Sequence, residues 1–295
     1  LWRSQAARQW ASAFRRGPAA LRQAAEPTQR LPAAGSERAR SPAAADGDQP
    51  PTGGPAPDTP TPTGGTGGNQ GPAAGRPPGP RLRAVELRLA YPGGVTALDG
   101  VGIELPVGRV TAVVGPNGAG KSTLFDCLAG SLRPRAGRVL LDGVDITRRP
   151  AHARTRLGIA RSFQQLAVFP SLTVEENVRI GAEQGGAHRS GDDATDLALR
   201  LFGLAGPVRR RPAAGLPTGT LRRVELARAL AGRPHTLLLD EPAAGLDAGE
   251  AEALARILAA LAADGLAILV VEHDPDLVAG IAHTVHTMEG GRIVS

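Results

Sequence analysis

The chain has 295 residues, 41% hydrophobic and 3% aromatic, which allows one or two domains with a large core. Its net charge is +6, but residues 1–80 hold nine Arg against five acidic residues, so the remainder gives no reason to expect nucleic acid. The single cysteine, Cys127, excludes a disulfide framework, and no apolar run approaches the roughly 18 residues of a membrane-spanning helix.

The first 80 residues divide into two segments of different composition. Within residues 1–40, Trp2, Ala6, Trp10 and Phe14 recur at intervals of four among arginines. On a helix this gives a basic, aromatic stripe suited to a bilayer surface or a groove, although a frayed end would have the same pattern. Residues 41–80 contain eleven prolines and ten glycines, which predicts a disordered linker.

Residues 81–295 are predicted to form an α/β domain. Apolar residues alternate with polar ones over 85–89 and 101–105, which predicts two antiparallel strands on either side of a turn at 91–94. Further strands are predicted at 110–114, 139–141, 159–162, 236–239, 266–272, 285–288 and 292–294, and helices within 171–231 (broken at 185–193) and at 250–263 and 275–282. Alternating strands and helices imply a mostly parallel sheet wrapped by helices, with ligand at the carboxyl ends of the strands.

A glycine-rich turn joins the strand 110–114 to the helical pattern that follows it. The segment has the form G-x-x-x-x-G-K-[ST], typical of a phosphate-binding P-loop. Its residues are Gly115, Pro116, Asn117, Gly118, Ala119, Gly120, Lys121 and Ser122, followed by Thr123. Backbone N–H groups and the helix N-terminus attract phosphate, Lys121 can reach the β and γ phosphates, and the Ser122 hydroxyl can ligate Mg²⁺. Lys121 is the only lysine among 34 basic residues, which argues against a simple glycine turn.

The apolar strand 237–239 ends in two carboxylates, Asp240 and Glu241. The first can hold Mg²⁺ through water, and the second is placed to take a proton from an attacking water. Such a pair could also cap the following turn. Its position after a P-loop favours a Walker B element with a general base.

With these motifs in this order, residues 81–295 resemble the ATP-binding subunits of ABC transporters. The resemblance implies a P-loop NTPase fold with an antiparallel β subdomain and a helical subdomain at about 165–231. It also assigns family roles to single residues: Tyr91 to stacking on adenine, Gln164 to Mg²⁺ and the attacking water, Asp247 to the D-loop, and His273 to the γ-phosphate. Asp247 also precedes Glu250 by three residues, which predicts a capping box independent of function.

The signature element departs from the family pattern. Leu216-Pro217-Thr218-Gly219-Thr220 replaces Leu-Ser-Gly-Gly-Gln, and a helix is expected over 221–231. In ABC dimers this helix N-terminus faces the γ-phosphate held by the opposite subunit. Pro217 removes a hydroxyl and a backbone donor, which leaves Gly219, the hydroxyls of Thr218 and Thr220, and the helix dipole. The proline is similar to that of the branched-chain amino acid importers, as are residues 169–178 and 241–246.

The resemblance implies an ATPase subunit of an importer for branched-chain or related amino acids, with ATP and Mg²⁺ as cofactors. Catalysis would fall to Glu241, His273, Gln164 and Lys121. The implied partners are a second ATP-binding subunit and a permease at the cytoplasmic face of the membrane. The permease could be separate, or could be fused to this chain ahead of Leu1. The alternatives are an ATPase for another substrate or a catalytically weak partner of a second ATPase.

Overall fold

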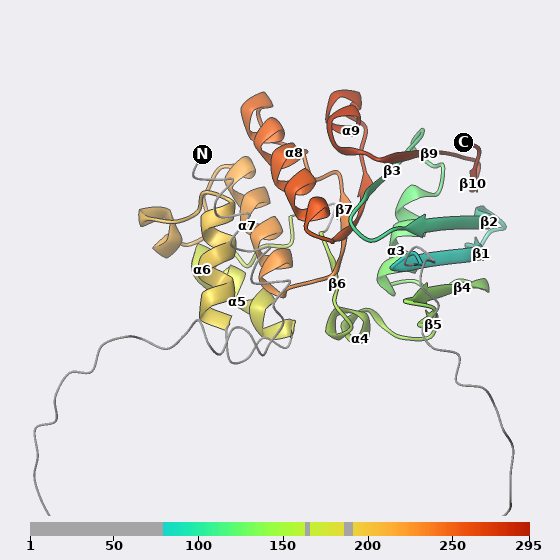
Figure 1. Ribbon diagram of the computed structural model, residues 1–295, viewed down its shortest axis with the longest axis horizontal. Coiled ribbons are helices and arrows are strands. Elements are labelled where there is room, and N and C mark those ends of the chain that lie inside the picture. Colours follow the sequence, from blue (N-terminus) through green and yellow to red (C-terminus); the bar gives the residue numbers. More distant parts are fainter. Residues whose placement is uncertain (1–78, 163–165, 186–190) are drawn as a thin grey trace, which may run out of the picture. The chain divides into compact units, whose positions relative to one another are not determined.

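The computed structural model describes residues 79–162, 166–185 and 191–295 (Figure 1). The predicted segment 1–40, the linker 41–80 apart from Gly79 and Pro80, and Gln164 lie outside the described residues. Within them, the predicted α/β architecture is confirmed as a larger, mainly parallel sheet and a smaller antiparallel sheet.

The larger sheet has six strands in the order β10-β9-β3-β8-β7-β6. They are β3 (Val110–Val114), β6 (Ile159–Arg161), β7 (Thr236–Asp240), β8 (Ala267–Val271), β9 (Thr284–Glu289) and β10 (Arg292–Ile293). All neighbours are parallel except the β9–β10 pair. The centre of this sheet is buried on both faces, as expected for parallel strands covered by helices.

Successive residues of the central strands belong to two different hydrophobic clusters. Leu237, Leu239 and Ile268 belong to a cluster with the helices on one face of the sheet, including Leu258 of α8. The intervening residues, such as Leu269, belong to a second cluster that includes α3 and the smaller sheet. The period of two along each strand therefore divides the core into two layers.

The smaller sheet has the order β2-β1-β4-β5 and is antiparallel throughout. Its strands are β1 (Leu82–Ala90), β2 (Thr96–Leu105), β4 (Ala136–Leu141) and β5 (Val144–Asp145). The hairpin of β1 and β2 and the turn at residues 91–94 are as predicted.

Seven helices, counted over the described residues, surround the sheets. They are α3 (Lys121–Ala129), α4 (Ala151–Arg156), α5 (Val174–Gln184), α6 (Gly191–Leu201), α7 (Thr218–Ala231), α8 (Ala248–Ala263) and α9 (Pro275–Ile281), with a 3₁₀ turn at Pro207–Arg210. Helices α5, α6 and α7 pack against one another, apart from the smaller sheet (Figure 1). No described helix has the length and apolarity needed to cross a bilayer.

The predicted start of the last of these three helices was wrong. Helix α7 begins at Thr218, not after residue 220, with Pro217 as its N-cap. The first turn of a helix needs no backbone donor to an earlier carbonyl, so a proline can stand directly before it. Thr218, Gly219 and Thr220 thus form the first turn itself.

Candidate functional site

Four neighbouring parallel strands end at the same edge of the larger sheet, and each is followed by one of the predicted motifs. In spatial order, β3 leads into the P-loop, β8 into His273, β7 into Asp240 and Glu241, and β6 toward the position of Gln164. Segments separated by more than 150 residues are therefore joined at one place. This edge is where ligands bind in parallel α/β sheets.

The P-loop passes directly from β3 into α3. Gly120 is the N-cap, with a φ of 101°, and no side chain caps the helix N-terminus. Lys121 extends back across the loop, where its Nζ donates to the carbonyl oxygens of Gly115 at 2.7 Å and Pro116 at 2.9 Å. Burial lowers the pKa of Lys121, against the opposing effect of the nearby Glu241 and Asp240. The loop is thus ordered around a single ammonium group.

Two glycines of the loop are required by close backbone approach. A Cβ at Gly115 would lie 2.2 Å from the carbonyl oxygen of Met288, and one at Gly120 would lie 2.3 Å from that of Ala97. Both also have a positive φ, which disfavours any larger residue. The loop therefore packs tightly between β9 and β2.

Tyr91 lies beside the P-loop helix. Its hydroxyl is 3.1 Å from Oγ1 of Thr123 on α3, and the residue is 40% exposed. The turn after β1 and the P-loop are therefore adjacent, with an accessible aromatic ring at their junction.

Asp240 is a buried carboxylate at the end of β7, only 6% exposed. Its backbone N–H donates to Oγ of Ser162 at 2.9 Å, but its carboxylate makes no hydrogen bond or ion pair with another described residue. Burial, reinforced by the charges of Glu241 and Asp126, raises its pKa to about 6. A carboxylate left in this state is suited to receive a cation.

Glu241 has an unusual backbone conformation. Its φ is +46°, although it carries a Cβ and precedes a proline. Its N–H donates to the carbonyl oxygen of Val271 at 2.8 Å, and one carboxylate oxygen lies 3.3 Å from Nε2 of His273. Both side chains remain partly exposed, at 31% and 44%. The strained turn thus brings two predicted catalytic residues together at an open surface.

Glu272 is a residue of this site that the sequence analysis missed. It is 4% exposed, and its carboxylate accepts hydrogen bonds from the backbone N–H groups of Ala243 at 2.9 Å and His273 at 3.0 Å. Glu272 therefore holds the turn after Glu241 to the segment that carries His273. The available signal was a carboxylate directly after an apolar strand and before a histidine.

A second missed contact connects the P-loop helix to β6. Arg161 donates to Asp126 of α3 at 2.9 Å, and its guanidinium lies 5.3 Å from the centre of the Phe125 ring. The strand that leads toward Gln164 is therefore tied to the helix that begins at Lys121.

The signature residues and the D-loop are adjacent within the chain. A Cβ at Gly219 would lie 2.6 Å from Oε2 of Glu250, and Arg223 lies 3.4 Å from the same carboxylate. Asp247 caps α8 and forms the predicted capping box with Glu250. Helix α7 packs with α5 and α6, whereas α3 packs against β2, β6 and β7, so the chain does not bring its own signature onto its own P-loop (Figure 1).

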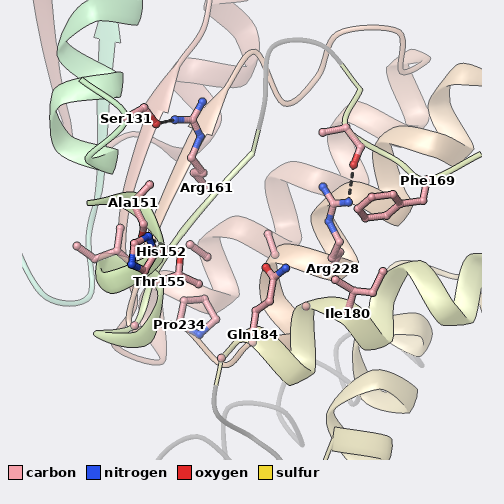
Figure 2. A pocket seen from close by; sticks show the side chains of 18 residues that line it. Ser131, Ala151, His152, Thr155, Arg161, Phe169, Ile180, Gln184, Arg228 and Pro234 are labelled. Carbon is pink, nitrogen blue, oxygen red and sulfur yellow. Dashed lines mark hydrogen bonds between the residues drawn. The ribbon is translucent and has the colours of Figure 1, made fainter. Parts of the chain in front are cut away.

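A groove of about 360 Å³ lies between α4 and β6 on one side and the helices α5 and α7 on the other, which we call the two halves of the domain. Figure 2 shows Arg161, His152 and Thr155 on one wall, and Phe169 and Arg228 on the other. The Phe169 ring is exposed and lies 5.7 Å from the guanidinium of Arg228. The lining of the groove is thus mainly apolar, with a few polar and charged side chains and the exposed ring of Phe169.

Within the described residues there is no cluster of three or more His, Cys, Asp or Glu side chains that could hold a metal ion. A P-loop, a strand-end carboxylate pair and a histidine at one sheet edge define the chain as a P-loop nucleoside triphosphatase.

Comparison with known proteins narrows this class. Residues 98–244 match the ABC transporter family. The chain is 39% identical over 224 residues to the cobalt import ATP-binding protein CbiO of Rhodobacter capsulatus, covering 73% of this chain and 78% of that protein. It is 34% identical over 229 residues to the branched-chain amino acid transport ATP-binding protein LivG of Escherichia coli K12, covering 72% and 89%. It is 38% identical to the ribose import protein RbsA 1 of Rubrobacter xylanophilus, but spans 44% of that longer protein.

Solved structures agree. A nucleotide-free ATP-binding cassette superposes with a TM-score of 0.65 at 30% identity, covering 73% of this chain and 90% of that one. A dimeric post-hydrolysis state of the cassette MJ0796, bound to ADP and Pi, gives 0.66 at 25% identity, covering 72% and 97%. The chain belongs to the ATP-binding subunits of ABC transporters, and it is an ATPase.

Proposed function

We propose that this chain hydrolyses MgATP to drive an importer of branched-chain or related amino acids at the cytoplasmic face of a membrane. The observation that carries the proposal is the convergence of Lys121, Asp240, Glu241 and His273 at one sheet edge. Its substrate class is supported by the relationship to LivG and by Pro217 in the signature.

The chain's own groups divide the reaction between them. Lys121 and the N–H groups at the start of α3 bind the phosphates and stabilise the charge that develops on the transferring phosphoryl group. Glu241 takes a proton from the attacking water. His273, 3.3 Å from that carboxylate, orients it and contacts the γ-phosphate. Tyr91 offers its exposed ring to the adenine, and Gln164 is proposed to reach the same water.

The donors present fit magnesium. Ser122 supplies an exposed hydroxyl at the start of α3, and Asp240 supplies a carboxylate without a hydrogen-bonding partner among the described residues. Mg²⁺ is characteristically held by one or two carboxylates together with substrate phosphates, not by a cluster of protein ligands. When bound, it would neutralise phosphate charge.

A second ATP-binding subunit completes the site. Thr218, Gly219 and Thr220 form the first turn of α7, which carries the positive end of the helix dipole. Placed head to tail, a second subunit would present this turn, with Asp247, to the nucleotide held by the first. The groove of Figure 2 is proposed to receive the permease, because its two walls come from the two halves of the domain.

Reconstitution of this chain with its permease and the associated binding protein tests the proposal. We expect ATP turnover that rises when the matching binding protein is loaded with a branched-chain amino acid, and no rise with ribose or Co²⁺. Stimulation by ribose or Co²⁺ alone would overturn the substrate class while leaving the ATPase assignment intact. No ATP turnover under any condition would overturn the catalytic assignment.

One observation favours a second candidate, a catalytically weak partner of another ATPase. Pro217 stands where the family pattern has a serine, so the signature lacks that serine hydroxyl and no side chain caps α7. Turnover by the purified chain alone favours the first candidate. Turnover that requires a different ATP-binding subunit favours the second.

A further inference from the structure

A strongly basic hollow lies outside the proposed nucleotide site. It measures about 550 Å³ and is lined by residues of the α3–β4 loop, β4, and the segment from β5 toward α4. Five of its lining residues are arginines: Arg133, Arg135, Arg138, Arg148 and Arg149. We call this surface the basic hollow.

Hydrogen bonds from Thr147, together with the charges of Arg138 and Arg148, lower the pKa of Asp145, but the five guanidinium groups make no closer contact in the described part of the chain. All five residues are exposed, and none of their side chains makes an ion pair or hydrogen bond there. Some exposed arginines on other faces are paired, such as Arg83 with Glu104 and Arg256 with Glu252. The single acid of the hollow, Asp145, accepts hydrogen bonds from the N–H and hydroxyl of Thr147. Five positive charges thus face one carboxylate that is already engaged.

The backbone of the hollow is held in place by hydrogen bonds from a buried arginine. Beneath it lies Arg154, which is 1% exposed. Its guanidinium donates to the carbonyl oxygens of Arg149 at 2.9 Å and Thr147 at 3.1 Å, and to those of Cys127 and Leu128 at the end of α3. A sixth, buried positive charge therefore holds the backbone that presents Arg148 and Arg149.

The chemistry of the lining selects its ligand. The planar fork of arginine matches the oxygens of phosphate. Besides the arginines, Asp145 and Thr147, the hollow is lined only by Pro134 and Gly137. It lacks the aromatic and aliphatic anchors at the centre of protein interfaces, and it lacks the aromatic rings on which single-stranded nucleic acids stack. A phosphate-bearing anion fits this surface better than either macromolecule.

The basic hollow is next to the groove of Figure 2. Ser131 and Ala151 line the groove, whereas Arg133 and Arg149, each two residues away along the chain, line the hollow. Resting on the proposed function, in which the groove receives a membrane-embedded permease, we propose that the basic hollow binds the phosphate headgroups of anionic phospholipids. Basic side chains close to a bilayer bind anionic lipid cooperatively and in a salt-dependent way.

Vesicle binding tests this proposal. The full chain is sedimented with phosphatidylcholine vesicles containing 30 mol% phosphatidylglycerol, without permease or nucleotide. A triple variant of the hollow, Arg135→Gln/Arg138→Gln/Arg148→Gln, is compared with a control triple on other faces, Arg83→Gln/Arg200→Gln/Arg256→Gln. Both variants lose the same net charge, and both keep the N-terminal residues of the wild type. We expect the first to lose about 10-fold or more of the affinity and the second less than twofold. Equal losses, or equal binding to pure phosphatidylcholine, would overturn the proposal.

Two further arms separate other ligands. Polyglutamate represents an acidic protein segment, and inorganic pyrophosphate represents a free phosphate ligand. Loss of polyglutamate or pyrophosphate binding in the first triple, with vesicle binding intact, would overturn the lipid assignment. Retained ATP turnover in that triple verifies its fold. The vesicle measurement needs no transport. If the proposed transport function fails, the measurement therefore still tests lipid binding by the hollow.

Discussion

Nε2 of His273 lies 3.3 Å from Oε1 of Glu241, although the two residues follow different strands. The contact places a group able to donate a hydrogen bond against the carboxylate proposed as general base. Since β8 and β7 are neighbours in the sheet, their ends determine this distance.

Replacing Glu241 by Gln should separate binding from hydrolysis. The amide keeps the shape of the side chain but cannot take a proton from water, so turnover should fall by roughly 10²–10⁴-fold with ATP affinity retained. Single-turnover hydrolysis and equilibrium binding measure the two effects. Glu252→Gln, an exposed change on α8, is the matched control. Wild-type turnover in Glu241→Gln would remove this residue from the role.

Glu272 should act as a positioning residue. Replacement by Ala removes the acceptor for the N–H groups of Ala243 and His273, so Glu241 and His273 lose their fixed separation. We expect kcat to fall about 10- to 100-fold with little change in KM for ATP. Glu272→Gln, which keeps one acceptor oxygen, should lie between Ala and wild type.

A merely structural role for Glu272 gives a different result. It would lower the folded fraction and the melting temperature while leaving kcat per folded molecule unchanged. Glu104→Gln, on the antiparallel sheet and paired with Arg83, controls for loss of a carboxylate elsewhere.

The parts of the site that the sequence predicted are those encoded locally. The P-loop requires consecutive residues, and Asp240 with Glu241 follows an unmistakable apolar strand. The order of β3, β8 and β7 is set by contacts distant in sequence, so the meeting of Glu241 with His273 was not predictable from spacing. Glu272 was missed for the same reason, because its partner Ala243 lies 29 residues earlier. The start of α7 was misplaced because residues 216–220 were taken as a signature element that precedes the helix, whereas Thr218 to Thr220 form its first turn.

Asp240 should contribute less to the stability of the free protein at neutral pH than near pH 4. Its pKa is raised to about 6 in the folded state from 3.8, so the folded state binds the extra proton between these values. Its contribution to the free energy of unfolding therefore falls as pH rises through this window. Asp240→Asn should be more stable than wild type by about 1–2 kcal/mol at pH 7.5, allowing for residual solvent screening, with little difference at pH 4.

Urea unfolding without nucleotide or Mg²⁺ measures this difference. Glu183→Gln, an exposed carboxylate replacement on α5, is the matched control. A stability gain for Asp240→Asn that is equal at pH 4 and pH 7.5 would contradict the assignment to its titration.

Two glycine-to-alanine changes should have opposite effects on stability. A Cβ at Gly181 would lie 2.0 Å from the carbonyl oxygen of Arg228, so Gly181→Ala must push α5 away from α7 and should destabilise by about 1–3 kcal/mol. Gly280 lies in α9 with nothing within 4 Å of the added carbon. Gly280→Ala should therefore stabilise by up to about 1 kcal/mol through helix propensity. Urea unfolding of the two variants measures the shift of each midpoint from that of the wild type, with the dependence of the unfolding free energy on urea held equal. Equal midpoint shifts for Gly181→Ala and Gly280→Ala would contradict the close α5–α7 contact.

The single lysine allows the P-loop to be probed chemically. Burial lowers the pKa of Lys121, which increases the neutral amine available to acetic anhydride, and no other lysine competes in the sequence. With MgATP at 100 times its dissociation constant, only about 1% of the loops are free, so acetylation of Lys121 should slow roughly 100-fold. Mass spectrometry of the P-loop peptide measures the rate, with Lys121→Arg as the unreactive control. Equal acetylation with and without MgATP would show that the nucleotide does not occupy this loop.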